Sequence, residues 1–571
     1  MATFHTRVSF FGGAPLVAAL LIAAPTEAAT LTVCPSGCDQ STIQGAADAA
    51  DPGDTIQILS VLPHTEANIS LTKDLTIEGL GEHDTVIQAT TAGTGVPAGP
   101  VFVVTLGANI AMKELTIRYG VNSDGGGISI LDGSVMLEDV TVRENRADSS
   151  GGGIYVAATS SLEMIRGTIA SNNSGSTGGG VAAEGPVEMT STDITSNSVG
   201  ATGDGEGGGI WSSGALILRS CRIDSNRAEG ATVNDTVIGG GLFYQGPNLL
   251  IEDSWILNNV ADTSATFVAE GGGIYLTGTG TATVRRTAIR SNTADVGAGH
   301  FSRNEALIVE DCTISNNNAA NSGGGIELRH LSATSVVRIL HSTISENEAD
   351  WAGGGLFIVT FGRVLISNST ISGNSAGDHG GGIADWDIGV EIASSTITDN
   401  TADSDADGIG DGGGIWISGA VSVMLQNTIV ASNHDLSPPP SLSATECNGT
   451  VESAGYNLIE SVGQFPKSCI IVGTTTGVIV GVDPLLGVLA DNGGATETHA
   501  LGPGSVAINA GNPSGCLDPD GALLDVDQRY GLRQDNCDIG AFEWGAVVEL
   551  VFEDGFESAS TSAWSSSVPL R

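Results

Sequence analysis

Hydrophobic residues recur along the chain in a repeat of about 25 to 32 residues. Each repeat contains a triplet of small residues, usually Gly-Gly-Gly, followed by an apolar residue that we call the anchor. A second pattern follows, an apolar residue with asparagine three positions later, from Val142 and Asn145 to Ile397 and Asn400. Only the last repeat, with Ile429 and Asn433, departs from this spacing. We expect the anchors to be Ile128, Ile154, Val181, Ile210, Leu242, Ile274, Phe301, Ile326, Leu356, Ile383 and Ile415.

Within a repeat, apolar and polar residues alternate over short segments, as at Leu162, Met164 and Ile169. Glycine, asparagine and serine separate these segments, which predicts short strands and no helices. Two or three short strands in each repeat predict one coil of a parallel β-helix, in which equivalent residues of successive coils form rows. Asparagine tolerates a tight corner, and its amide can bond the same amide in the next coil. We therefore expect a buried asparagine ladder.

The two ends of the chain differ from the repeats. Arg7, an apolar run over 14–24 and Ala28-Ala29 together are typical of a secretory signal. A later apolar run long enough to cross a bilayer is missing from the sequence, so we expect no transmembrane span. The expected organisation is a signal peptide (1–29), an N-terminal cap with a helix over 41–50 and the first coils (30–110), regular coils (111–435), C-terminal coils and cap (436–545) and a tail (546–571).

The chain of 571 residues has 65 acidic and 21 basic residues, a formal charge of −44. Such a surface repels nucleic acid and attracts divalent cations, so we expect no nucleic-acid partner. The sequence leaves the oligomeric state open.

An exported protein meets an oxidising environment, in which its cysteines can pair. Cysteines that are close in sequence suggest three bridges: Cys34 with Cys38, Cys447 with Cys469, and Cys516 with Cys537. Cys221 and Cys312 fall in one inward row, three coils apart. That distance is too long for a bridge, so we expect two buried free thiols.

Four coils have long loops after the asparagine, three of them on neighbouring coils. The residue after the anchor should point outward, and in these four coils it is Trp211, Phe243, Tyr275 or Trp416. One interpretation is a ridge of rings that binds a glycan or a cell-surface protein. The other is that the long loops fold back and cover the rings as a small second core.

The fourth long loop is rich in aspartate. Asp403, Asp405, Asp407 and Asp411 occupy positions 1, 3, 5 and 9 of a segment with Gly408 at position 6. This spacing is typical of the first part of a calcium-binding loop, but position 12 is Gly414 instead of glutamate. We expect weak calcium binding there, with a solvated acidic loop as the alternative.

Several motifs resemble known families. The segments 52–56 and 75–79 look like the opening of secreted right-handed β-helix proteins of the pectate-lyase-like type, and the glycine triplets with downstream asparagine resemble polymorphic outer membrane protein repeats. Segments 483–487, 491–494, 504–511, 527–529 and 537–543 are similar to the closing region of bacterial choice-of-anchor Q surface proteins, with Tyr530 as a departure. The resemblance implies an all-β, right-handed parallel β-helix with an N-terminal helical cap and an irregular, disulfide-containing C-terminal cap.

The resemblance also implies a secreted or cell-surface protein on the outer-membrane side of a bacterium, and transfers no catalytic residues. We expect a noncatalytic protein that displays loops for adhesion or for glycan or protein binding. A polysaccharide lyase or hydrolase and a structural surface-layer protein are the alternatives. His300 we interpret as a tolerated, exposed replacement of a triplet glycine.

Overall fold

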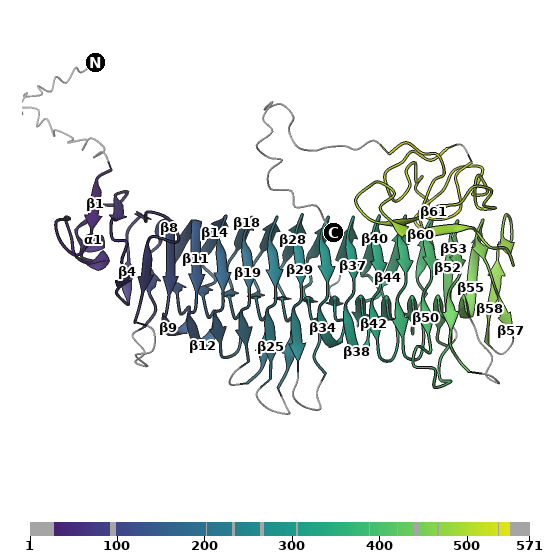
Figure 1. Cartoon of the computed structure of the whole chain (residues 1–571), viewed down its shortest axis with the longest axis horizontal. Coiled ribbons are helices and arrows are strands. Elements are labelled where there is room, and N and C mark those ends of the chain that lie inside the picture. The colour runs from purple at the N-terminus through teal and green to yellow at the C-terminus, as the bar shows by residue number, and fades with distance from the viewer. Residues whose placement is uncertain are drawn as a thin grey trace, which may run out of the picture.

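The computed structural model describes residues 28–91, 99–200, 203–230, 235–262, 268–303, 306–329, 331–387, 389–419, 421–438, 445–464, 467–534 and 536–548. The chain winds into one long parallel β-helix, with an irregular lobe near its C-terminal end (Figure 1). The all-β fold class is confirmed. The expected signal peptide and most of the tail lie outside the described residues.

The strands that begin with the anchors form sheet B. Each anchor pairs with the anchors of the coils before and after it, as Ile128 pairs with Ile154 and Ile154 with Val181. The first and third residues of these strands point into the core, and the second points outward. The strands are β4 (Ile69–Leu71), β7 (Phe102–Val104), β10 (Ile128–Ile130), β13 (Ile154–Val156), β17 (Val181–Ala183), β22 (Ile210–Ser212), β27 (Leu242–Tyr244), β31 (Ile274–Leu276), β35 (His300–Ser302), β39 (Ile326–Arg329), β43 (Leu356–Val359), β47 (Ile383–Asp385) and β51 (Ile415–Ile417).

Sheet A follows sheet B in each coil and has two rows of strands. The first row contains β1 (Thr30–Val33), β2 (Thr55–Ile58), β5 (Leu75–Glu78), β8 (Ala108–Arg118), β11 (Gly133–Arg143), β14 (Ser161–Ile165), β18 (Val187–Thr190), β23 (Leu216–Arg219), β28 (Asn248–Glu252), β32 (Thr281–Arg285), β36 (Ala306–Glu310), β40 (Val336–Leu340), β44 (Arg363–Ser367), β48 (Glu391–Ala393), β52 (Ser422–Gln426), β55 (Cys447–Gly455) and β58 (Lys467–Gly473). The second row contains β3 (His64–Thr65), β6 (Val86–Gln88), the ends of β8 and β11, β15 (Thr168–Ala170), β19 (Asp193–Thr195), β24 (Arg222–Asp224), β29 (Trp255–Leu257), β33 (Ala288–Arg290), β37 (Thr313–Ser315), β41 (Thr343–Ser345), β45 (Thr370–Ser372), β49 (Thr396–Thr398), β53 (Ile429–Ala431), β56 (Leu458–Ile459) and β59 (Ile479–Val480).

Sheet C lies after the asparagine corner, and the long loops leave the coils beyond it. Its strands are β9 (Val121–Asp124), β12 (Arg146–Ser150), β16 (Asn173–Ser174), β20 (Ser198–Val199), β25 (Arg227–Glu229), β30 (Val260–Asp262), β34 (Thr293–Val296), β38 (Asn318–Ser322), β42 (Glu348–Ala349), β46 (Ser375–Ala376), β50 (Thr401–Ala402) and β54 (His434–Asp435).

The asparagine ladder runs unbroken through the core. Asn145 donates its backbone N–H and its side-chain amide to Oδ1 of Asn172, both at 3.0 Å. Equivalent bonds link each later asparagine to the next as far as Asn433. Each amide also donates to a backbone carbonyl of the preceding coil, as Asn172 does to Val142 at 2.9 Å. The predicted ladder is therefore confirmed.

Two assignments within the repeat were wrong by one residue. The seventh anchor is His300, which pairs with Ile274 and Ile326 and is fully buried, while Phe301 points outward. The expected exposure of His300 was therefore also wrong. In the last repeat Val430 pairs with Ile397 and points inward, which restores the spacing of three to Asn433. Strand alternation explains both shifts, because only every second residue faces the core.

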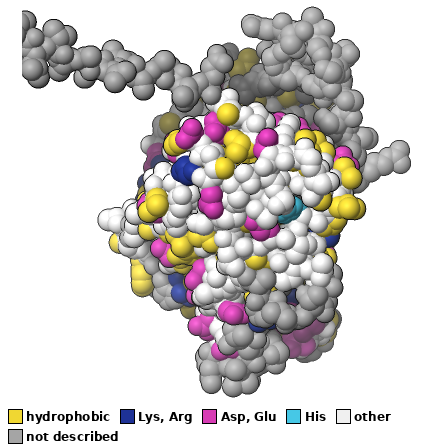
Figure 2. Space-filling model, turned by 90° about the vertical axis from the view of Figure 1, so that its left-hand side faces the viewer, with side chains coloured by type: hydrophobic (Ala, Val, Ile, Leu, Met, Phe, Trp, Pro, Cys, Tyr) yellow, Lys and Arg dark blue, Asp and Glu magenta, His cyan; other side chains and the backbone are white. Residues whose placement is uncertain are grey.

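A short helix covers the N-terminal end, as predicted. Helix α1 (Ile43–Ala49) buries Ile43, Ala46 and Ala47, and the Thr42 hydroxyl caps it by accepting from the Gly45 N–H at 3.1 Å. With seven residues, α1 is much too short to cross a bilayer, and no other described segment forms a helix that could. Seen from this end, carboxylates are spread across the described surface (Figure 2).

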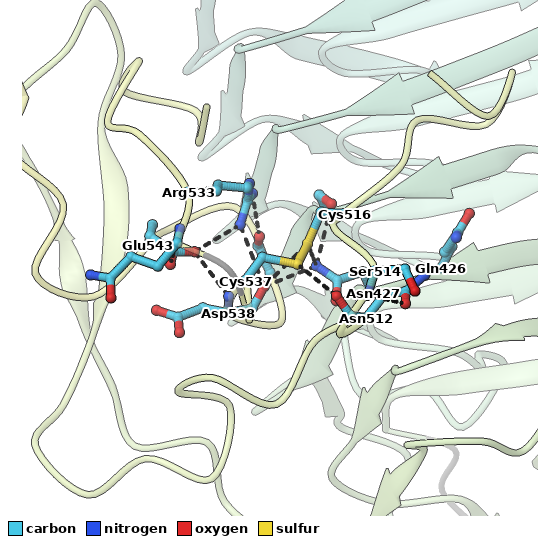
Figure 3. Close-up of a disulfide and its surroundings, with 12 residues drawn as sticks. Gln426, Asn427, Asn512, Ser514, Cys516, Arg533, Cys537, Asp538 and Glu543 are labelled. Atoms are coloured by element: carbon cyan, nitrogen blue, oxygen red, sulfur yellow. Dashed lines mark hydrogen bonds and ion pairs between the residues drawn. A yellow bond between two sulfur atoms is a disulfide. The ribbon is translucent and has the colours of Figure 1, made fainter. Parts of the chain in front are cut away.

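The C-terminal lobe packs along the outer side of sheet A. It contains the hairpin β60 (Leu486–Ala490) and β61 (Thr498–Leu501), and otherwise turns. The Gln528 amide joins it to the coils, donating to Thr343 Oγ1 at 2.9 Å and accepting from Thr370 Oγ1 at 2.6 Å. The disulfide Cys516–Cys537 lies at this contact (Figure 3).

All three expected disulfides are present. The Cα atoms are 5.5 Å apart in Cys34–Cys38, 5.1 Å in Cys447–Cys469 and 6.1 Å in Cys516–Cys537. Beside the last bridge, Asn427 of the solenoid donates to the Asp538 carbonyl at 2.9 Å. The remaining described cysteines, Cys221 and Cys312, are buried free thiols as predicted.

Candidate functional site

The outward positions of sheet B carry the aromatic row that the repeat predicted. Trp211, Phe243 and Tyr275 stack on neighbouring coils, with ring centroids 6.1 and 5.4 Å apart. Phe301 extends the row by one coil, at 5.0 Å from Tyr275. The register of the coils thus brings these rings together, whereas their predicted role in ligand binding stays a prediction.

Most of this row is buried. Phe243 and Tyr275 are each only 4% exposed, and Trp211 is half-buried. In these coils the residue four positions before the anchor packs over the rings. The next residue is a glycine with positive φ, such as Gly239 at φ 67°, and it turns the chain back toward the row. Ile238 packs on the rings in this way. Our interpretation of the row as an exposed ridge was therefore wrong for Phe243 and Tyr275, which belong to a small second core.

Polar groups cover the same row. The Trp211 indole N–H donates to Glu206 Oε2 at 2.9 Å, and the Arg303 guanidinium lies over the rings of Tyr275 and Phe301. Arg303 in turn pairs with Glu270 at 3.1 Å. The tips of the three long loops beyond these residues lie outside the described part of the chain.

A second group of aromatic rings lies farther along sheet B and is open to solvent. We call Trp351, Phe357, Trp386 and Trp416 the tryptophan cluster. Trp386 lies 5.5 Å from Trp351 and 5.2 Å from Trp416, with the ring planes tilted by about 50°. Trp386 is 37% exposed, and Trp351 and Trp416 are half-buried. The cluster therefore combines a packed base with accessible ring surface.

The cluster forms because one outward position of sheet B is small. Ala384 occupies the position that Phe357 and Trp416 hold in the flanking coils. The space above its methyl group is filled by Trp386, which follows two residues later and again points outward. Trp386 consequently contacts rings from both flanking coils, Trp351 and Phe357 on one side and Trp416 on the other.

Acidic and imidazole groups surround the tryptophan cluster. His379 stacks on Trp416 with centroids 4.6 Å apart, and burial lowers the pKa of its imidazole. The Asp411 carboxylate pairs with Lys467 at 2.5 Å. The backbone of Asp411 forms an isolated β-bridge with the backbone of His379 on the neighbouring coil. Burial raises the pKa of the Asp411 carboxyl, although Lys467 opposes the shift.

The structure brings together three of the four aspartates expected to bind calcium. Oxygen atoms of Asp403, Asp405 and Asp407 lie within 4.8 Å of one another. Asp403 is buried and accepts from the Gly408 N–H at 3.1 Å, whereas Asp405 and Asp407 are exposed. Asp411 is held by Lys467 and is not part of this group. Three carboxylates with an open side suit a hard cation such as calcium.

The sequence matches the family described as right handed beta helix region over residues 102–289, 239–376 and 272–460. These overlapping ranges together cover more than half of the chain. The chain belongs to the right-handed beta helix family. The predicted handedness agrees with this membership, but the match does not extend to the narrower choice-of-anchor Q or polymorphic outer membrane protein groups. No curated protein is significantly similar to the chain in sequence.

Solved structures similar to this right-handed beta helix protein include two pectin methylesterases and a pectate lyase. A pectin methylesterase mutant in complex with a hexasaccharide is 15% identical, with 46% of this chain and 79% of that chain covered and a TM-score of 0.26. Pectin methylesterase PemA from Erwinia chrysanthemi is 15% identical, with 47% and 80% covered and a TM-score of 0.22. Pectate lyase Pel9A is 12% identical, with 91% and 97% covered and a TM-score of 0.23. With TM-scores this low, these similarities carry no argument about the protein.

Glu327 of this right-handed beta helix protein combines a strongly raised pKa with complete burial. Burial raises the pKa of Glu327 to about 7, yet its side chain is fully buried against Ser322 and Arg329. On the outer face of sheet A, by contrast, Lys113 and then Arg166 lower the pKa of Glu138. A general acid needs a raised pKa and access to substrate, and neither carboxylate has both.

Sequence reasoning singled out Trp416 but missed Trp351 and Trp386. A signal was available for Trp386: after the tenth anchor, Ile383, the outward residue is the small Ala384, with tryptophan two residues later. Trp351 precedes a glycine turn, and its approach to the cluster depends on that turn, which strand alternation does not describe.

Proposed function

We propose that this protein is an exported, noncatalytic β-helix that binds neutral glycans at the tryptophan cluster. The observation that carries the proposal is the exposure of Trp386 above two half-buried tryptophans. Rings fixed by packing offer a flat apolar surface at little cost in conformational entropy. Sugar rings, which are apolar on their C–H faces, pack against such surfaces.

The charges around the cluster favour a neutral ligand. Asp378, Asp403 and Asp411 lie on adjoining segments, and their carboxylates would repel an anionic sugar. The carboxylates of Asp378 and Asp411, which are partly exposed, are hydrogen-bond acceptors for sugar hydroxyls. We therefore expect neutral hexose oligomers to bind more tightly than uronates at this site.

Export is part of the proposal. Three disulfides are typical of an oxidising compartment, and the sequence opens with the signal pattern described above. A secreted or cell-surface location would place the tryptophan cluster where it meets extracellular glycans. Adhesion to a cell-surface protein through the three neighbouring loops is the corresponding proposal for the middle of sheet B. The roots of two of these loops are held side by side, because β21 (Gly205–Glu206) pairs with β26 (Val237–Ile238).

We also propose that calcium binds Asp403, Asp405 and Asp407. The ion would join the acidic loop to the edge of the tryptophan cluster, because Asp403 is bonded to the backbone of Asp378 beside His379. With three protein carboxylates, the affinity suits extracellular calcium concentrations.

A glycan array tests the proposed binding. The mature protein, Trp386→Ala and Trp544→Ala would be compared, because Trp544 is a similarly exposed tryptophan on the C-terminal lobe, at 40%. The proposal predicts neutral-glycan signals that Trp386→Ala abolishes and Trp544→Ala retains. Equal signals from the two variants would refute it.

A further inference from the structure

A trough lies on sheet A beside the C-terminal lobe, well separated in the fold from the tryptophan cluster on sheet B. Its volume is about 620 Å³, within the range of ordinary ligand sites. We define the trough by Trp255, Leu257, Ala288, Arg290 and Thr313 of the coils and Ala495 of the lobe.

The shape of the trough follows from one row of sheet A. Trp255, Ala288 and Thr313 are paired on successive coils. Trp255 is 43% exposed and stands at one end, and Ala288 forms a low floor. The lobe closes the other end, where Thr343 of the next coil is buried and donates to the Glu497 carbonyl at 2.6 Å. The result is a depression with an aromatic wall.

Arg290 is the unusual residue of this trough. It pairs across the coils with Leu257 and Ser315, and its Nε atom is buried without a hydrogen-bond partner. Every other described arginine forms an ion pair or, for Arg118, hydrogen bonds to Gln88. The chain has 65 acidic residues, yet Arg290 forms no ion pair with any described carboxylate. Its guanidinium is therefore available to a hydrogen-bond acceptor from another molecule.

The other charges that line the trough are already satisfied. Arg286 pairs with Asp253 at 2.7 Å. Asp311 accepts from the Tyr530 hydroxyl at 2.8 Å. A ligand anion would therefore meet one free cation, on the side of the trough away from these pairs.

We propose that the trough binds an acidic sugar, with its ring against Trp255 and its carboxylate on Arg290. A planar guanidinium matches a carboxylate with two parallel hydrogen bonds, and the indole offers the apolar surface beside it. This site is independent of the tryptophan cluster, so that either proposal can fail alone.

Calorimetric titration of the mature protein with an oligogalacturonate, its methyl ester and a sulfated oligosaccharide tests the proposal. We expect the uronate to bind, and both methyl esterification and Arg290→Gln to weaken its binding about tenfold or more. Trp255→Ala should weaken binding of the uronate, whereas Trp386→Ala should leave uronate binding unchanged. Tighter binding of the sulfated probe than of the uronate would contradict the carboxylate assignment.

Arg146→Gln is the matched control, because Arg146 is an exposed arginine on sheet C with 62% of its side chain accessible. It should bind the uronate like the unmodified protein. Since Arg290 has no internal partner, Arg290→Gln should also melt at an unchanged temperature. A lowered melting temperature, an equal effect of the two arginine variants, or no binding of any acidic probe would overturn the proposal.

Discussion

Asn433 donates both its backbone N–H and its side-chain amide to Glu446 Oε2, at 3.2 and 2.7 Å. The asparagine ladder thus ends on a buried carboxyl group, which takes the position of the next asparagine. Glu446 is only 3% exposed, and burial raises its pKa to about 8 from an ordinary 4.5.

This ending gives the fold a pH dependence. The folded state keeps the Glu446 proton up to about pH 8, whereas the unfolded state loses it near pH 4.5, so stability falls as pH rises between these values. Glu446→Gln removes the ionisation and should reduce the loss between about pH 5 and pH 8 by about 3–4 kcal/mol. Urea unfolding of the unmodified protein and of Glu446→Gln at both pH values measures this difference in the free energy of unfolding. An unchanged pH dependence in the variant would contradict this account.

His300 should have the opposite pH dependence. Its two ring nitrogens are buried without partners, and burial lowers its pKa to about 4 from 6.5. Stability from the neutral ring is present above pH 6.5 and is lost as pH falls toward 4, because the unfolded chain then binds the extra proton. His300→Ile matches the neighbours Ile274 and Ile326 and should raise the free energy of unfolding by about 1–3 kcal/mol.

Thermal melts at about pH 5 and pH 7 check the His300 prediction. His83→Gln serves as the control, because 91% of the His83 side chain is exposed. If His300→Ile destabilised the protein at both pH values, the ring would have a partner that the structure does not show.

The sequence predicted the solenoid because its period, glycine triplets and asparagine ladder act locally and repeat in every coil. The sequence pointed to Phe301 instead of His300 as the seventh anchor, because a triplet of small residues fits two registers. It pointed to Ile429 instead of Val430 in the last repeat, because a run of three apolar residues also fits two registers. Only pairing with the neighbouring coils decides which residue faces inward.

The candidate site was less predictable. Trp416 and the aspartates stand out in the sequence, but the approach of Trp351 and Trp386 depends on a turn and on the space above Ala384. The trough at Arg290 was not predictable for a similar reason. The lobe that closes it is more than 200 residues away in sequence and folds back onto sheet A.

Phe243 should matter for stability. It is 4% exposed and stacked between Trp211 and Tyr275. Phe243→Ala should lower the free energy of unfolding by about 3–5 kcal/mol, because it leaves a cavity in the second core. Phe361→Ala, at a phenylalanine that is 67% exposed, should change it by less than about 0.5 kcal/mol. Similar effects of the two variants in denaturant unfolding would show that the aromatic row is not a packed core.

Calcium should raise the melting temperature through Asp403, Asp405 and Asp407. An ion that binds only the folded state stabilises it by mass action. The rise over a chelator control should be lost in Asp405→Asn and kept in Asp148→Asn, because Asp148 is an exposed carboxylate on another coil. If the melting curves with calcium and chelator coincide, no calcium binds there.

The central claim is that the exposed tryptophan cluster is a glycan-binding surface. The most direct measurement is the dissociation constant for the strongest neutral glycan of the array, determined by calorimetry with the unmodified protein and Trp386→Ala. The account predicts at least about a tenfold weakening in Trp386→Ala while the variant keeps a cooperative thermal unfolding transition, because Trp386 is 37% exposed and lies outside the inward core. An unchanged dissociation constant would contradict it.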